Sequence, residues 1–432
     1  MPKIFVYDKF APQDTAMMQA LYSRSAQSVE VHAQKVQEAG SGKFMERFYV
    51  GYGHLSIADC GSTTIFIEGV STLVAKAVQD WPLYAGQETS TRYIDMSQQA
   101  ITDPVGTKNS KAILDTWVAF YLGSQEAVRA HIREKYPRKD GEDIKVYERA
   151  INARSFDILR GFLPAGIMTQ LSWHTNLRQA WDKLAILRHH PLTEVREVAA
   201  EIHTQLKEKY AHSFSHELYA DQEQYRDTVA RRYNYFNPEQ YPDFALHTTI
   251  DAHALEQYRD ITTMRPPHVG LPHFLTELGQ CTFDFLLDFG SFRDIQRHRN
   301  GVCRMPLLTT RFGFHPWYVE QLPVAARKEA ENLVVQQKEA VEQLHADENE
   351  AQYYHAMGYR VPCRVTYGLP PMVYVIELRS GKTVHPTLRT VAHQMHHALK
   401  QQFPKLVIHA DTDPDDWDVR RGLQDIKEKG SK

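Results

Sequence analysis

Two stretches of the chain share one order of residue types: GHLSIADCGSTTIFIEGVSTLVAKAVQDWP at 53–82 and GLPHFLTELGQCTFDFLLDFGSFRDIQRHR at 270–299. Each has a turn with small residues and histidine, then an apolar segment rich in Thr and Phe, then a helix-like segment. Setting Thr64 against Thr282 brings the strand-like pieces TIFIEGV and TFDFLLDF into register, with Gln79 opposite Arg297. Such self-similarity predicts an internal duplication.

A largely helical stretch follows each of the two segments. Helix-like runs at 108–136, 144–190 and 194–214 follow the first, and similar runs at 324–358 and 387–403 follow the second. Between the halves, FNPEQYPDF is rich in Pro, Asn and aromatic residues, which is typical of a boundary. We therefore expect an α+β protein with two copies of one domain, at residues 1–230 and 231–432, each with a small antiparallel sheet and helices.

Composition excludes several broad classes of protein. The 432 residues suffice for two domains, and 42% hydrophobic with 24% charged residues is typical of a globular protein. A net charge of -3 gives no global attraction to nucleic acid, and no apolar run is long enough to span a membrane, so we expect a cytosolic protein. The four cysteines form no C-x-x-C pair, which argues against a disulfide framework or cysteine-rich zinc site.

The loop Glu88-Thr89-Ser90-Thr91-Arg92 is the first candidate for ligand binding. Its backbone N–H groups, hydroxyls and guanidinium group suit a phosphate. An ordinary solvated loop has a similar composition.

The triplet Arg297-His298-Arg299 is the second candidate. Clustered guanidinium groups could hold a pyrophosphate or a flavin ring, and the imidazole could donate a hydrogen bond to either. The alternative is a solvated basic helix end, stabilised by the helix dipole. A nucleic-acid patch is a third interpretation, which the acidic balance of the chain disfavours.

With these two motifs, the chain resembles a tandem, two-copy relative of the flavin-dependent thymidylate synthases. In that family the triplet and the loop run consecutively, as R-H-R-x-x-S-x-N-E-x-S-x-R-Y. Family members are homotetramers that bind FAD and dUMP where subunits meet. The resemblance therefore implies that the two copies form a pseudo-dimer, which pairs again into a homodimer of pseudo-dimers.

Each copy retains a different part of the family's site. The first has Gln79-Asp80-Trp81, or Asp80-Trp81-Pro82 with another gap placement, where the triplet should be, but keeps the loop. It also has Arg160 in an R-x-x-L-P match and Asn176 with Arg178 in a T-x-N-x-R match. The second copy keeps the triplet and Arg379 in an L-R match, whereas its R-x-x-L-P position reads Gly358 to Pro362. The complementary losses predict one composite site.

By resemblance, reduction of FAD by NADPH would support transfer of a one-carbon unit from methylenetetrahydrofolate to C5 of dUMP, giving dTMP without a protein nucleophile. Flavin contacts would come from Arg297, His298, Arg299, His54, Asn176 and Arg178. Nucleotide contacts would come from Glu88, Thr89, Ser90, Thr91, Arg92, Arg160 and Arg379.

Three positions depart from the family pattern: Ala85 and Gln87 replace a Ser and an Asn, and Asp294 replaces a Gln. They motivate two alternatives, a non-catalytic flavin- or nucleotide-binding relative and a flavoenzyme that modifies another pyrimidine. A metal site at His393, His396 and His397 would have helical spacing, but we favour a solvated or packed helix there because no carboxylate partner is placed by sequence.

Overall fold

The computed structural model describes residues 10–23, 25, 27–51, 53–89, 95–234 and 238–413. The Ser90, Thr91 and Arg92 part of the predicted phosphate loop lies outside them. Two compact units are present: Met1–Thr89 with Thr169–Asn234, and Ser90–Met168 with Tyr235–Lys432. The second break in the chain lies close to the predicted boundary at 230. However, residues 90–168 group with the C-terminal half, so the units do not coincide with the predicted consecutive copies.

The first unit is built around a two-stranded sheet of β1 (Ser62–Ser71) and β2 (Met168–Asn176). Its helices are α1 (Pro12–Tyr22), α2 (Val29–Ala39), α3 (Gly42–Phe44), α4 (Thr72–Gln79), α7 (Leu177–Leu187), α8 (Thr193–Lys209) and α9 (Ala220–Asn234), with η1 (Met45–Gly51), η2 (Leu55–Cys60) and η5 (Ala211–Ser213). The side chain of Ser71 accepts a hydrogen bond from the Val74 backbone N–H at 3.3 Å and so caps α4.

The second unit contains an antiparallel four-stranded sheet in the order β3-β4-β6-β5. These strands are β3 (Phe244–Thr248), β4 (Gln280–Asp288), β5 (Val302–Arg304) and β6 (Arg360–Gly368). Every second residue of β4 is fully buried, including Phe283 and Phe285, which lie opposite Val365 and Cys363 of β6. This period of two places one face of the sheet in the core.

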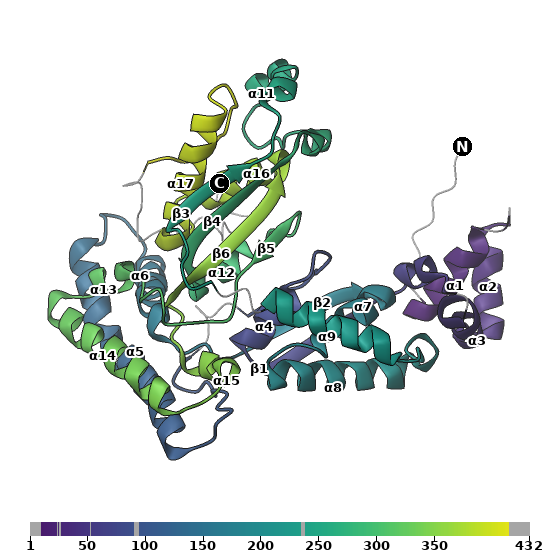
Figure 1. Ribbon diagram of the computed structural model, residues 1–432, viewed down its shortest axis with the longest axis horizontal. Helices are drawn as coiled ribbons and strands as arrows, with labels where there is room; N and C mark the ends of the chain where they lie inside the picture. The colour runs from purple at the N-terminus through teal and green to yellow at the C-terminus, as the bar shows by residue number, and fades with distance from the viewer. Residues whose placement is uncertain are drawn as a thin grey trace. The chain divides into compact units, whose positions relative to one another are not determined.

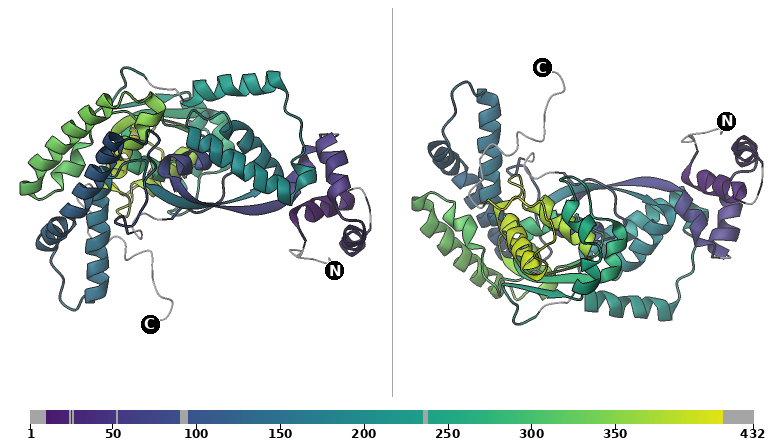
Figure 2. Two further views of the ribbon diagram at one scale, coloured as in Figure 1. Left: turned by 90° about the horizontal axis from the view of Figure 1, so that it is seen from below. Right: turned by 90° about the horizontal axis from the view of Figure 1, so that it is seen from above.

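Helices cover the sheet of the second unit and extend beyond it. They are α5 (Lys108–Lys135), α6 (Ile144–Leu159), α10 (Ala252–Glu256), α11 (Arg259–Met264), α12 (Phe289–Ile295), α13 (Pro316–Glu320), α14 (Val324–Gln343), α15 (Glu348–Ala351), α16 (Leu369–Arg379) and α17 (Pro386–Gln402), with η4 (Arg160–Phe162), η6 (His273–Leu278) and η7 (Gln352–Tyr354). Helices α16 and α17 pack together and against β4 (Figure 1). Helix α14 crosses α5 (Figure 2), where the Gln337 side chain donates to the Ile113 carbonyl at 3.1 Å.

The expected strands at TIFIEGV and TFDFLLDF are confirmed as β1 and β4, but the expected helical run 144–190 is wrong in its middle. There α6 ends at Leu159 and the chain enters η4 and then β2. Burial alternates along β2, so the segment buries one face of a strand. Between two helices, a short apolar segment cannot be recognised as a strand from its sequence, because the spacing of its apolar residues fits a helix as well.

The order of elements repeats along the chain, with equal lengths in several places. The elements η4, β2 and α7 are followed 192 residues later by η7, β6 and α16, beginning at Gln352 after Arg160, Arg360 after Met168, and Leu369 after Leu177. The structural counterpart of Arg160 is therefore Gln352, which corrects the predicted Gly358.

The helix caps decide how the triplet aligns with the first repeat. Strands β1 and β4 begin at Ser62 and Gln280, the register expected from Thr64 and Thr282. The helices that follow these strands are capped by Ser71 and Asp288. The separation in sequence between the two caps is one residue shorter than the separation between the two strand starts. This spacing places 80–82 opposite the triplet, which is the second of the two gap placements.

The two repeated segments meet within the second unit. Pro164 and Ala356, which are counterparts at the spacing of 192, face each other in an antiparallel bridge. Ala165 N–H donates to the His355 carbonyl at 2.9 Å, and Met357 N–H donates to the Leu163 carbonyl at 2.8 Å. Each contact is thus matched by its exchanged counterpart at the spacing of 192 residues.

Candidate functional site

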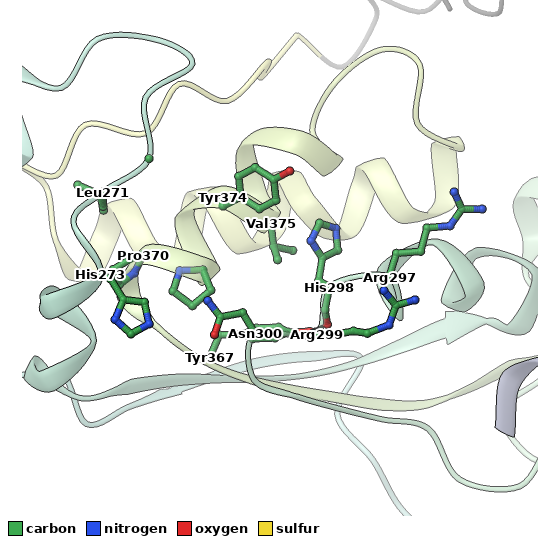
Figure 3. Close-up of a pocket in the computed structure, with 12 residues that line it drawn as sticks. Leu271, His273, Arg297, His298, Arg299, Asn300, Tyr367, Pro370, Tyr374 and Val375 are labelled. Atoms are coloured by element: carbon green, nitrogen blue, oxygen red, sulfur yellow. Dashed lines mark hydrogen bonds between the residues drawn. The ribbon is translucent and has the colours of Figure 1, made fainter. Parts of the chain in front are cut away.

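A pocket of about 360 Å³ opens beside the triplet in the second unit. It lies between the segment after α12, the first turns of α16 and the chain leading into η6 (Figure 3). Its lining residues are Gly270, Leu271, His273, Arg297, His298, Arg299, Asn300, Tyr367, Pro370, Pro371, Tyr374 and Val375. The pocket thus combines two guanidinium groups and imidazoles with two tyrosine rings.

Helix α12 brings the triplet to the pocket. Its N-cap is Asp288, fully buried, whose Oδ1 accepts hydrogen bonds from Ser291 N–H at 2.9 Å and from the Tyr318 hydroxyl at 2.7 Å. The helix ends at Ile295, and the triplet follows within one turn. Positive side chains are favourable at this end because of the helix dipole.

Arg379, the last residue of α16, holds the central histidine of the triplet. Its Nε donates to His298 Nε2 at 2.8 Å, and its Nη2 donates to the Asp294 carbonyl at 2.6 Å. A guanidinium group can only donate, so Nε2 is the acceptor and the proton of the neutral ring lies on Nδ1. Burial, assisted by Arg379 and Arg299, lowers the pKa of His298 to about 3. His298 is therefore a neutral hydrogen-bond donor at pH 7.

The carboxylate of Asp294 lies among several guanidinium groups. Arg297 Nη2 lies 3.6 Å from its Oδ1. Burial alone would raise the pKa of Asp294, but Arg160, Arg297, Arg379 and Arg293 together lower it below its usual value. Asp294 is therefore ionised at neutral pH, next to the triplet.

Arg160 is buried against the first turn of α12. Its Nη2 donates to the Ser291 hydroxyl at 2.9 Å, while its buried Nε has no hydrogen-bond partner among the described residues. Burial would lower the pKa of Arg160, but the neighbouring Tyr318 and Asp288 raise it, so the group stays charged. Arg160 is not among the residues that line the pocket, although its charge acts on Asp294.

The remaining candidates from the first half belong to the first unit. Asn176 caps α7, since its Oδ1 accepts from Gln179 N–H at 2.8 Å. Arg178 forms ion pairs with Asp59 at 2.8 Å and Asp182 at 3.6 Å.

His54, Glu88 and Thr89 also lie in the first unit. His54 is exposed before η2, and Glu88 accepts a hydrogen bond from Gln79 Nε2 at 2.8 Å. Thr89 N–H donates to the Gln170 carbonyl at 2.9 Å. The second unit thus contains the triplet, Arg160 and Arg379. The first unit contains His54, Glu88, Thr89, Asn176 and Arg178.

The first repeat carries different chemistry at the positions that match the pocket. Trp81 takes the place of His298, and its indole N–H donates to Gln179 Oε1 at 3.0 Å. Lys183, the counterpart of Val375, is buried and donates to the Asp80 carbonyl at 2.7 Å. Leu187 stands where the second repeat has Arg379. Trp81 and Leu187 therefore cannot form a counterpart of the hydrogen bond between Arg379 and His298.

Sequence reasoning missed the two tyrosines and His273 of the pocket. Tyr374 is 56% exposed, which is unusual for an aromatic residue in an otherwise apolar helix, and it lies five residues before Arg379. Because the same helix carries the L-R match, this position could have indicated Tyr374 as a residue of the site. Nothing in the sequence distinguishes Tyr367 from a core residue of β6, where its ring is almost fully buried.

The described residues contain no group of three or more His, Cys, Asp and Glu side chains that could hold a metal ion. In α17, His393 contacts the Asp411 carbonyl at 2.8 Å and His397 contacts Gln401 at 2.8 Å. Among the helices of the described segments, none is both long and apolar enough to cross a bilayer.

Comparison with known proteins supports the expected kinship. Residues 7–210 match the family model described as thymidylate synthase complementing protein. A UPF0159 protein of Chlamydia pneumoniae is 24% identical over 415 residues, covering 83% of this chain and 77% of the relative. One from Chlamydia muridarum is 25% identical, covering 90% and 85%, and one from Thermoplasma acidophilum is 22% identical, covering 91% and 94%. Residues 7–210 are therefore similar to the thymidylate synthase complementing protein family.

Proposed function

We propose that the protein is an FAD-dependent thymidylate synthase-like enzyme, which methylates dUMP reductively to dTMP with methylenetetrahydrofolate and NADPH. The observation that carries the proposal is the basic pocket, in which the triplet lies beside two tyrosines and its histidine is held from behind by Arg379. The family match supports a nucleotide substrate. The names of the three UPF0159 relatives state no activity.

The residues of the pocket fit part of a flavin or a nucleotide. A volume of about 360 Å³ is suited to a ring system with one phosphate, and larger ligands would extend through the open side. Tyr374 offers an exposed aromatic face, while Arg297 and Arg299 offer donors for phosphate oxygens. When bound, FAD would supply the hydride chemistry of the reaction.

The side chains would then bind and orient the ligands. The neutral His298 ring would donate its Nδ1 proton to a carbonyl or ring nitrogen without adding charge, because Arg379 occupies Nε2. Arg297 and Arg299 would neutralise phosphate charge. Arg160 would hold α12, and with it the triplet, through Ser291.

In this proposal the two repeats form a pseudo-dimer with one composite site. Support comes from the reciprocal hydrogen bonds around Pro164 and Ala356, and from the replacement of His298 by Trp81 in the first repeat. The phosphate contacts of the site would come from the loop Glu88, Thr89, Ser90, Thr91 and Arg92. His54, Asn176 and Arg178 would contact the flavin, and two chains would associate as a homodimer.

A second candidate is a binding protein without turnover, or a flavoenzyme for another pyrimidine. The favouring observation is the ionised Asp294 beside the triplet, where the family has an uncharged Gln. A different charge at this position changes which ligands the pocket accepts.

The test combines a spectrum with a turnover assay. The protein reconstituted with FAD should show the visible absorption band of a bound flavin, and NADPH should bleach it under anaerobic conditions. Addition of dUMP and methylenetetrahydrofolate should then reoxidise the flavin and yield dTMP. If flavin binds but no dTMP forms, the protein is either a binding protein without turnover or a flavoenzyme that modifies another pyrimidine. If no flavin binds, both flavoenzyme proposals are wrong.

A further inference from the structure

The arginine cluster beside the pocket contains an anion of its own. The Asp294 carboxylate lies 3.6 Å from Arg297 Nη2, and its side chain is 28% exposed. Arg379 touches the same residue, but through the main-chain carbonyl at 2.6 Å. The carboxylate therefore adds negative charge where an anionic ligand would approach.

Removing this charge need not disturb the pocket's geometry. Arg379 is held by the Asp294 carbonyl and by His298 Nε2, neither of which depends on the carboxylate. Arg297 is 60% exposed, and such long, exposed ion pairs order their side chains weakly. Repulsion of a ligand phosphate should therefore outweigh any loss of order when the carboxylate is removed.

We propose that Asp294 is a specificity-determining residue that limits the negative charge of the ligand, so that the pocket prefers a nucleoside monophosphate to its di- and triphosphates. The inference rests on the proposed nucleotide-binding function. One carboxylate partly neutralises the guanidinium groups of Arg297 and Arg379. The repulsion by this carboxylate grows with the number of phosphate charges on the ligand, so it disfavours di- and triphosphates more than a monophosphate.

The substitution Asp294→Asn tests this inference because it removes the charge and keeps the shape. We expect dUMP to bind about fivefold more tightly to the variant, dUTP to gain more than dUMP, and deoxyuridine to be unchanged. Binding would be measured by calorimetry on the FAD-reconstituted protein at constant ionic strength. In the Arg297→Gln background the gain should shrink, since part of the effect acts through that guanidinium.

Equal gains for deoxyuridine and dUTP, or weaker dUMP binding to Asp294→Asn, would overturn the inference. Asp294→Gln, which carries the family's side chain, provides a second uncharged variant if the first does not fold. Inorganic pyrophosphate is an independent probe and should also bind more tightly to both variants. If the wild-type chain binds pyrophosphate but no uridine nucleotide, the proposed function fails while the role of Asp294 is still decided by this probe.

Discussion

Replacing Arg379 with Gln removes a charge that lowers the pKa of His298 further than burial alone does. The two groups are hydrogen bonded at 2.8 Å, and Arg379 is the second cause, after burial, of the low His298 pKa of about 3. Two unit charges about 4 Å apart interact by about 4 kcal/mol at an effective dielectric constant of about 20, or about three pKa units. Burial remains in the variant, so we expect the pKa of His298 to rise by about one to three units.

The same substitution should weaken ligand binding. Hydrogen bonds to charged groups contribute about 1.5–3 kcal/mol, so loss of the guanidinium that aligns His298 predicts about 10- to 100-fold weaker FAD or dUMP binding. Proton NMR of the imidazole ring would follow the titration, and calorimetry the affinity. Arg259→Gln is a matched control, because Arg259 forms an exposed pair with Glu256 at 3.5 Å and does not line this pocket. An unchanged His298 titration with unchanged binding would show that Arg379 neither lowers the pKa of His298 nor aligns its ring for a ligand.

Two further substitutions test charge interactions, one in each unit. Arg160→Met removes a buried guanidinium that interacts with the buried Asp288 and donates to Ser291, and it should lower the unfolding free energy by about 3–5 kcal/mol in denaturant titrations. A loss below about 1 kcal/mol would show that this guanidinium contributes little to stability. Hydrogen bonds from Arg188, assisted by His189 and Arg226, lower the pKa of Glu223 to about 2. The stability they give α9 is present above the ordinary carboxyl pKa of about 4.3 and is lost as pH falls towards 2. The rate of amide hydrogen exchange in α9 should therefore no longer rise in acid in the Glu223→Gln variant. If the pH dependence of this rate is unchanged, another titrating group causes it.

The sequence predicted those parts of the fold that have a clear internal period or a repeated neighbour. The register of Thr64 with Thr282 correctly aligned β1 with β4, and the amphipathic runs located α5, α8 and α17. Strand β2 was hidden because its apolar residues adjoin two helices. Contact between residues 90–168 and the C-terminal half depends on distant partners, such as Trp117 donating to the Tyr354 carbonyl at 3.0 Å, which no local pattern reveals.

The candidate site was predictable where residues follow one another in the chain. The triplet and Arg379 were singled out from short motifs, and the structure brings them into contact through His298. The environment of Arg160 was not predictable, because Ser291, the partner of its guanidinium, is 131 positions away. Nor could spacing alone place the counterpart of Arg160, since the loops of the two repeats differ in length before η4 and η7.

Counting bound flavin distinguishes one composite site per chain from two separate sites. The measurement is the ratio of FAD absorbance to protein concentration for the wild-type chain, for Arg297→Ala and for Arg178→Ala, after removal of free flavin. We expect one FAD per wild-type chain and a large loss in both variants, although Arg178 and Arg297 belong to different repeats. Two FAD per chain, with only one lost in each variant, would contradict it.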